Sequence, residues 1–127
     1  MAIRILSVDD EQDLEVLLSH YFRRKIRKGE YEFFFAHNGV EALKLLVAHP
    51  DIDIILSDIN MPEMDGLTFV KAVRAKDEYK DLPILMITTE AAKEDILTAL
   101  RSGVNNYVVK PFTPETLQEK VFKLLDL

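Results

Sequence analysis

The chain has 127 residues, of which 48% are hydrophobic and 30% charged, and its formal net charge is -6. This length and composition are typical of one soluble globular domain, so we expect a single domain spanning residues 1–127. The chain has no cysteine, which excludes disulfides and zinc–thiolate sites and agrees with a cytoplasmic location. The acidic balance argues against nucleic-acid binding by this chain alone. No apolar stretch approaches the ~20 residues that cross a bilayer, so no membrane partner is expected.

Short apolar runs alternate with longer amphipathic segments along the whole chain. The predicted elements are, in chain order, a strand at 3–8, a helix around 14–22, a strand at 31–36, a helix at 38–48, a strand at 52–57, a helix at about 67–75, a strand at 83–87, a helix ending near 102–103, a strand at 106–109 and a helix from 114. Strict alternation of five strands with five helices predicts an α/β fold with a parallel sheet and helices on both faces.

Three helix ends carry recognisable capping residues. Asn38 precedes Glu41 by three residues, a variant of the capping box that predicts a helix start. Gly103 suits the C-terminal cap of the fourth helix. Thr113 followed by Pro114 predicts the N-cap and first turn of the last helix.

Four of the apolar runs end in a polar residue with useful chemistry. Asp9 and Asp10 follow the first run, Asp58 the third, Thr88 the fourth and Lys110 the fifth. The carboxyl ends of parallel strands lie along one edge of the sheet, where open α/β sheets bind ligands. We therefore expect these side chains to converge.

Three neighbouring carboxylates repel one another unless a counter-charge lies between them. The acidic group therefore predicts a Mg²⁺ site, which Mn²⁺ could also occupy, although a solvated acidic loop is the alternative. Lys110 could form a structural ion pair or hold a phosphoryl oxygen, and Thr88 could cap a strand or bind the same group. Together they favour a phosphoryl-transfer site with Asp58 as nucleophile, because Asp58 ends the most buried run.

Three segments resemble the motifs of two-component response regulator receiver domains. They are Val-Asp-Asp-Glu at 8–11, Asp-Ile-Asn-Met-Pro-Glu-Met-Asp-Gly at 58–66 and Tyr-Val-Val-Lys-Pro-Phe at 107–112. The resemblance covers essentially the whole chain and is greatest to the CheY-like, chemotaxis-type single-domain regulators. It implies a flavodoxin-like, doubly wound (βα)5 sandwich whose five-stranded parallel sheet has the order 2-1-3-4-5.

The resemblance implies a phosphoacceptor and a metal site. Asp58 would accept the phosphoryl group as an aspartyl phosphate. Asp10, Asp58 and the backbone carbonyl of Asn60 would bind Mg²⁺ directly, and Asp9 would act through a metal-bound water. Asn60 and Glu90, two residues after Asp58 and Thr88, occupy positions that tune loss of the phosphoryl group, so we expect relatively rapid autodephosphorylation.

The resemblance also implies a switch. Thr88 would turn toward the phosphoryl group, and Tyr107 would then turn inward into the vacated space. Lys110 would pair with a phosphoryl oxygen, and the Lys110–Pro111 peptide bond would be cis, which only an X-Pro bond adopts at low cost. This rearrangement would change the surface formed by the fourth helix, fifth strand and fifth helix.

The implied function is a phosphorylation-activated signalling switch that catalyses only its own phosphorylation and dephosphorylation. Its partners would be a histidine kinase or histidine phosphotransfer protein and a downstream output domain or effector. A homodimer through the fourth helix, fifth strand and fifth helix is also compatible with the resemblance. The one basic cluster, residues 23–28, is interpreted as a solvated helix end or as a docking surface for an acidic partner.

Three alternatives remain. The chain could be the receiver of a larger multidomain regulator, hybrid kinase or output enzyme. A haloacid-dehalogenase-type phosphohydrolase is disfavoured, because Asn60 stands where that class needs a second acid and because the chain has no cap insertion. A non-phosphorylated pseudo-receiver is disfavoured because all the acceptor-site residues are present.

Overall fold

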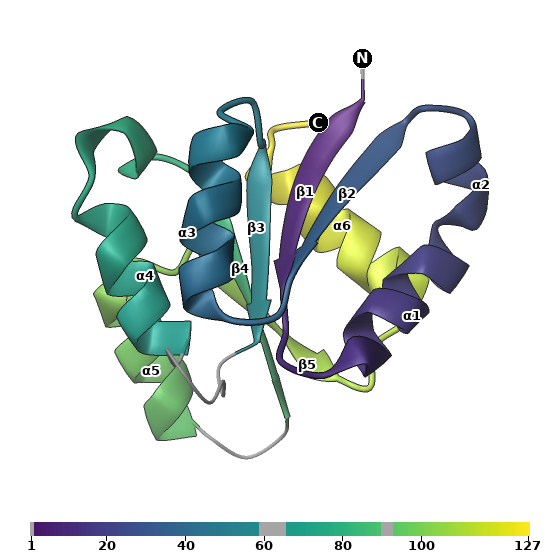
Figure 1. Ribbon diagram of the computed structural model, residues 1–127. Helices are drawn as coiled ribbons and strands as arrows, with labels where there is room; N and C mark the ends of the chain where they lie inside the picture. Colours follow the sequence, from purple (N-terminus) through teal and green to yellow (C-terminus); the bar gives the residue numbers. More distant parts are fainter. Residues whose placement is uncertain (1, 59–65, 90–92) are drawn as a thin grey trace.

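A computed structural model describes residues 2–58, 66–89 and 93–127. One parallel sheet forms the centre of the molecule, with the strand order β2-β1-β3-β4-β5 (Figure 1). Its strands are β1 (Ile3–Val8), β2 (Tyr31–Ala36), β3 (Ile54–Asp58), β4 (Ile84–Thr89) and β5 (Asn106–Lys110). The strand boundaries lie within two residues of those expected, and the predicted doubly wound order is confirmed.

Helices cover both faces of the sheet (Figure 1). They are α1 (Gln12–Tyr21), α2 (Arg23–Arg27), α3 (Gly39–Ala48), α4 (Gly66–Arg74), α5 (Lys93–Ser102) and α6 (Pro114–Leu124), with a short 3-10 turn η1 (Asp77–Tyr79). Buried residues of α1 and α6 form a core on one face, and those of α3, α4 and α5 form a core on the other. No helix in the described ranges is long and apolar enough to span a membrane.

The predicted caps are present. Asn38 Oδ1 accepts a hydrogen bond from the Glu41 N–H at 2.8 Å, and Thr113 Oγ1 accepts one from the Thr116 N–H at 3.1 Å. These bonds satisfy N–H groups that the first turn of a helix leaves without a partner. Gly103 follows α5 with φ of +114°, a conformation that favours glycine.

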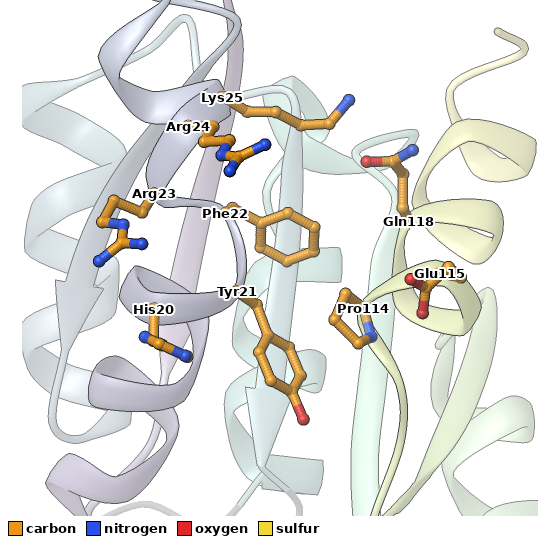
Figure 2. A pocket seen from close by; sticks show the side chains of 9 residues that line it. All are labelled: His20, Tyr21, Phe22, Arg23, Arg24, Lys25, Pro114, Glu115 and Gln118. Atoms are coloured by element: carbon orange, nitrogen blue, oxygen red, sulfur yellow. The ribbon is translucent and has the colours of Figure 1, made fainter.

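The prediction of one helix between the first two strands is wrong. The structure divides that segment into α1 and α2 at Phe22, whose φ of -110° and ψ of 21° leave the helical region. Phe22 is 5% exposed, and its ring lies 5.2 Å from that of Tyr31 and 6.2 Å from that of Phe33. Figure 2 shows the rings of Tyr21 and Phe22 directed toward α6 while Arg23 points away. Aromatic packing in the core therefore outweighs continuation of the helix.

Arg74 connects three segments on the α4 and α5 side of the sheet. Its guanidinium donates to the Gly103 carbonyl through Nε at 3.0 Å and Nη2 at 2.9 Å. Nη1 donates to the Tyr79 carbonyl at 2.7 Å, and Nη2 to Asn105 Oδ1 at 2.9 Å. A Cβ on Gly103 would lie 2.9 Å from Arg74 Cγ, so this close approach also requires glycine. The same Asn105 oxygen accepts from the Ile84 N–H at 2.8 Å, which links the cluster to β4.

We predict that Arg74→Ala lowers the free energy of unfolding by about 2–3 kcal/mol, because it leaves several carbonyl oxygens without their charged donor. Urea denaturation of both proteins measures this difference. Arg101→Ala, which removes an exposed arginine from α5, is the matched control and should change stability by less than about 0.5 kcal/mol. Equal effects of the two substitutions would contradict a structural role for the Arg74 cluster.

Candidate functional site

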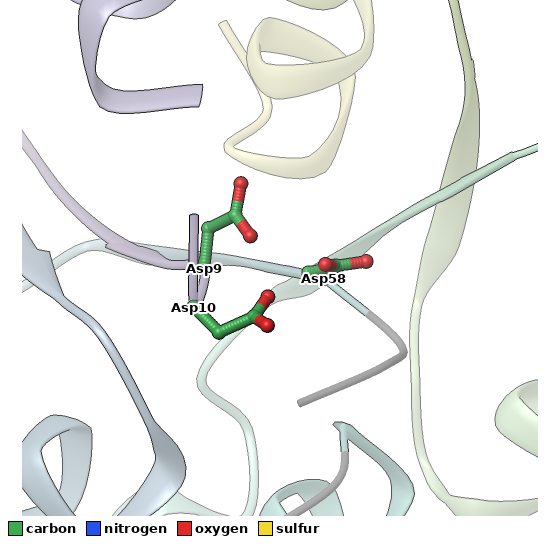
Figure 3. A group of neighbouring side chains, drawn as sticks. All are labelled: Asp9, Asp10 and Asp58. Atoms are coloured by element: carbon green, nitrogen blue, oxygen red, sulfur yellow. The ribbon is translucent and has the colours of Figure 1, made fainter. Parts of the chain in front are cut away.

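Three carboxylates meet where β1 and β3 end. Asp9 and Asp10 directly follow β1, and Val8 pairs with Ser57, the residue before Asp58. One oxygen from each of Asp9, Asp10 and Asp58 lies within 4.8 Å of the others. Figure 3 shows the three side chains gathered at this edge. The parallel register therefore brings together residues that lie far apart in the sequence.

Asp9 is the most buried member of this acidic cluster, with 5% of its surface exposed. Its Oδ1 accepts a hydrogen bond from the Glu11 N–H at 3.2 Å, whereas Oδ2 is buried and accepts none from the described residues. Burial, with a smaller contribution from the charge of Asp58, raises the pKa of Asp9 from 3.8 to about 6. The described residues therefore offset only part of the negative charge of an ionised Asp9 carboxylate.

The cluster fits a hard divalent cation. It offers oxygen donors only, and a cation would satisfy the buried Asp9 Oδ2. Asp58 is half-buried and Asp10 exposed, so the described residues leave one side of the cluster open to water. Magnesium, which usually keeps several waters, suits such a half-open site.

Thr88 and Lys110 lie at the same edge of the sheet. Asp58 pairs with Ile87, the residue before Thr88, and Thr89 pairs with Lys110 at the end of β5. Thr88 is 2% exposed, and Lys110 is half-buried. The charge of Lys110 lowers the pKa of Asp9, although less than burial raises it.

The Lys110–Pro111 peptide bond is cis, as expected. Tyr107 is half-buried and packs against the core beneath α3, α4 and α5; its switch role stays a prediction. Asn60 and Glu90 lie outside the described residues, so their expected roles remain predictions.

One contact of this region was not expected from the sequence. Lys120 Nζ, from α6, lies 5.5 Å from the ring centroid of Tyr107. A cation over an aromatic face stabilises the position of the ring. The two residues are 13 positions apart and on different elements, so no local periodicity pairs them.

We predict that Asp9→Asn stabilises the metal-free protein by about 1–3 kcal/mol at pH 7.5, because the folded state no longer holds an ionised carboxylate at this buried position. Near pH 4 the folded protein already binds the proton, so the gain should largely disappear. Denaturation at both pH values with a chelator measures the effect. Glu119→Gln, an exposed change of the same charge on α6, should show no such pH dependence. A gain for Asp9→Asn that is equal at both pH values would contradict the burial argument.

The chain resembles known proteins over its whole length. Residues 5–122 match the family model of the response regulator receiver domain. A "Chemotaxis protein CheY homolog" of Campylobacter jejuni is 44% identical over 123 residues, covering 97% of this chain and 92% of that protein.

Solved structures agree with this likeness. The chemotaxis protein CheY4 of Vibrio cholerae superposes with a TM-score of 0.86 at 38% identity, over 98% of this chain and 100% of that one. A response regulator from Chloroflexus aurantiacus superposes with a TM-score of 0.88 at 31% identity, over 100% of both chains. The chain therefore belongs to the response regulator receiver domain family and is a CheY-like member of it.

Proposed function

We propose that this protein is a signalling switch that accepts a phosphoryl group on Asp58 in a Mg²⁺-dependent reaction. The observation that carries the proposal is a cluster of three carboxylates in which Asp9 Oδ2 is buried and has no hydrogen-bond partner among the described residues, with Lys110 at the same edge of the sheet. A receiver domain is a signalling protein rather than an enzyme that turns over a substrate.

Residues at the carboxyl ends of the strands would each have a separate role in phosphoryl transfer. A carboxylate oxygen of Asp58 forms the new P–O bond while the P–N bond of a phosphohistidine donor breaks and its electron pair returns to the imidazole. Lys110 neutralises one phosphoryl oxygen, and the Thr88 hydroxyl donates a hydrogen bond to another. Asp9, Asp10, Asp58 and the Asn60 carbonyl would hold the metal. Bound Mg²⁺ supplies charge that offsets the negative oxygens during transfer.

The switch would run from the acidic edge to the surface of α5, β5 and α6. Thr88 is buried beside the acceptor strand, and Tyr107 packs on the neighbouring strand β5. A phosphoryl group on Asp58 would draw the Thr88 hydroxyl toward it and free space for the Tyr107 ring. The changed surface would alter affinity for an effector or for a second copy of the chain.

The expected setting is the cytoplasm, with a histidine kinase or histidine phosphotransfer protein as phosphodonor. We propose that residues 1–127 form one receiver domain. The same chemistry holds if this domain is the receiver of a larger regulator, because every residue assigned to it lies within the chain.

Acetyl phosphate with Mg²⁺ should add one phosphoryl group to the protein, as measured by intact mass spectrometry. Asp58→Asn should abolish the addition because it removes the nucleophile, and a chelator should do the same to the wild type. Glu119→Gln, which removes an exposed acid from α6, should leave it unchanged. Undiminished labelling of Asp58→Asn would assign the phosphoryl group elsewhere and overturn the proposal.

Beryllium fluoride with Mg²⁺, which mimics the phosphoryl group, should move the Tyr107 resonance in ¹⁹F NMR of protein labelled with 3-fluorotyrosine. Tyr107→Phe identifies that resonance among those of the four tyrosines. Thr88→Ala should reduce the movement, because the hydroxyl no longer follows the phosphoryl mimic. An unchanged Tyr107 resonance in the wild type would favour a scaffold that does not respond to phosphorylation.

A further inference from the structure

A groove of about 610 Å³ lies between the α1–α2 segment and the edge strand β2. On the helical side it is lined by Ser19, Arg23, Ile26 and Arg27. On the strand side it is lined by Tyr31, Glu32, Phe33 and Phe35, and the Glu32 carboxylate is paired with Arg4 at 3.6 Å. Its volume lies within the range of about 300–1,000 Å³ that is typical of ligand pockets. The helical side of the groove belongs to the segment where α1 ends at Phe22 and the chain continues as α2 beside the start of β2 (Figure 1).

The strand side of this groove is mainly aromatic, with Glu32 as its one charged residue. The rings of Phe33 and Phe35 are stacked, with centroids 5.7 Å apart and planes 6° from parallel, and Phe22 stacks on Phe33 at 6.2 Å. Both Phe33 and Phe35 are only half-buried, and Ile26 across the groove is 37% exposed. β2 is the edge strand of the sheet that the structure describes. The groove therefore offers apolar surface to an incoming side chain.

The helical rim of the groove is basic, because Arg23 and Arg27 line it and three further cations lie on the same short segment. Residues 23–28, Arg-Arg-Lys-Ile-Arg-Lys, carry five positive charges in a chain whose net charge is -6. Lys25 pairs with Glu30 at 3.8 Å. Arg23, Arg24, Arg27 and Lys28 are exposed, and none of them forms an ion pair with another residue that the structure describes. Such a local excess of cations favours a negatively charged partner.

We propose that this groove binds an acidic segment of a partner protein. An aromatic or leucine side chain of that segment would insert between Ile26 and the Phe33–Phe35 pair, and flanking carboxylates would face Arg23 and Arg27. Apolar anchors in a pocket with charged groups at the rim are the usual arrangement of protein interfaces, in which the anchor supplies most of the affinity.

The geometry favours a peptide over the two other occupants. A bilayer would meet the cations of the rim but would not reach aromatic rings along the wall of a groove. In a symmetric contact between two copies, the two basic rims would face each other and repel. An acidic peptide segment with one apolar anchor matches both the positive charge of the rim and the shape of the groove.

The groove is separate from the acidic cluster. It opens at the β2 edge of the sheet, whereas β5 forms the opposite edge. Its lining residues include none of the residues assigned to phosphoryl transfer or to the switch. The inference therefore does not rest on the proposed function, and a partner here could bind while another protein contacts β5.

Selection of a random phage-displayed peptide library against the full chain tests the inference. We expect the enriched peptides to combine Asp or Glu with an aromatic residue or leucine, and their synthetic copies to bind less tightly as salt increases. In fluorescence polarisation, the double variant Arg23→Glu/Arg27→Glu should raise the Kd about tenfold or more, because it reverses the rim charge. Ile26→Ser should weaken binding by about fivefold through loss of apolar contact.

Lys44→Glu/Lys71→Glu makes the same change of charge at two exposed positions of α3 and α4 and is the matched control. It should change the Kd by less than about twofold. All of these substitutions fall on exposed residues, and circular dichroism checks that each variant is folded.

Several results would overturn the inference. These are failure to enrich any peptide, enrichment of peptides without acidic residues, and binding that Arg23→Glu/Arg27→Glu leaves intact. Co-sedimentation with phosphatidylglycerol vesicles that Ile26→Ser abolishes would identify a bilayer as the partner instead. Concentration-dependent dimerisation that Arg23→Glu/Arg27→Glu abolishes would identify a second copy of the chain.

Discussion

Burial of the Asp9 carboxylate beside Asp10 and Asp58 is the constraint on which the proposed site depends. The parallel register of β1 and β3 holds the three carboxylates together, and burial of Asp9 prevents water from relieving the repulsion. Lys110 offsets only part of this charge. Under the proposed function a cation would offset the rest of this charge, and the parallel sheet holds Asp58, Thr88 and Lys110 at the same edge.

Features that depend on strand order could be predicted from the sequence. Alternating strands and helices lead to one parallel sheet, and in such a sheet residues that follow strands must share an edge. Asp9, Asp58, Thr88 and Lys110 could therefore be placed together without coordinates. Motif resemblance added the order of the strands and the cis bond before Pro111, both of which the structure confirms.

Features that depend on contacts between distant side chains could not be predicted. The break at Phe22 arises from its packing against rings of β2, which helical periodicity does not reveal. The bonds of Arg74 to Gly103 and Asn105 join segments about 30 residues apart, and the sequence shows only an arginine at a helix end. This cluster fixes the start of β5 relative to α4, so it supports the surface on which the switch would act.

The exposed edge of β2 has a consequence for solubility. Residues 31–36, Tyr-Glu-Phe-Phe-Phe-Ala, combine high β propensity with low charge and form the edge strand of the sheet that the structure describes. Such segments are prone to pair edge to edge with other copies and to aggregate. The basic residues of α2 stand directly beside this strand and would repel a like edge, so they act as gatekeepers. Substitutions that neutralise these basic residues should therefore lower the solubility of the protein even where the fold is unchanged.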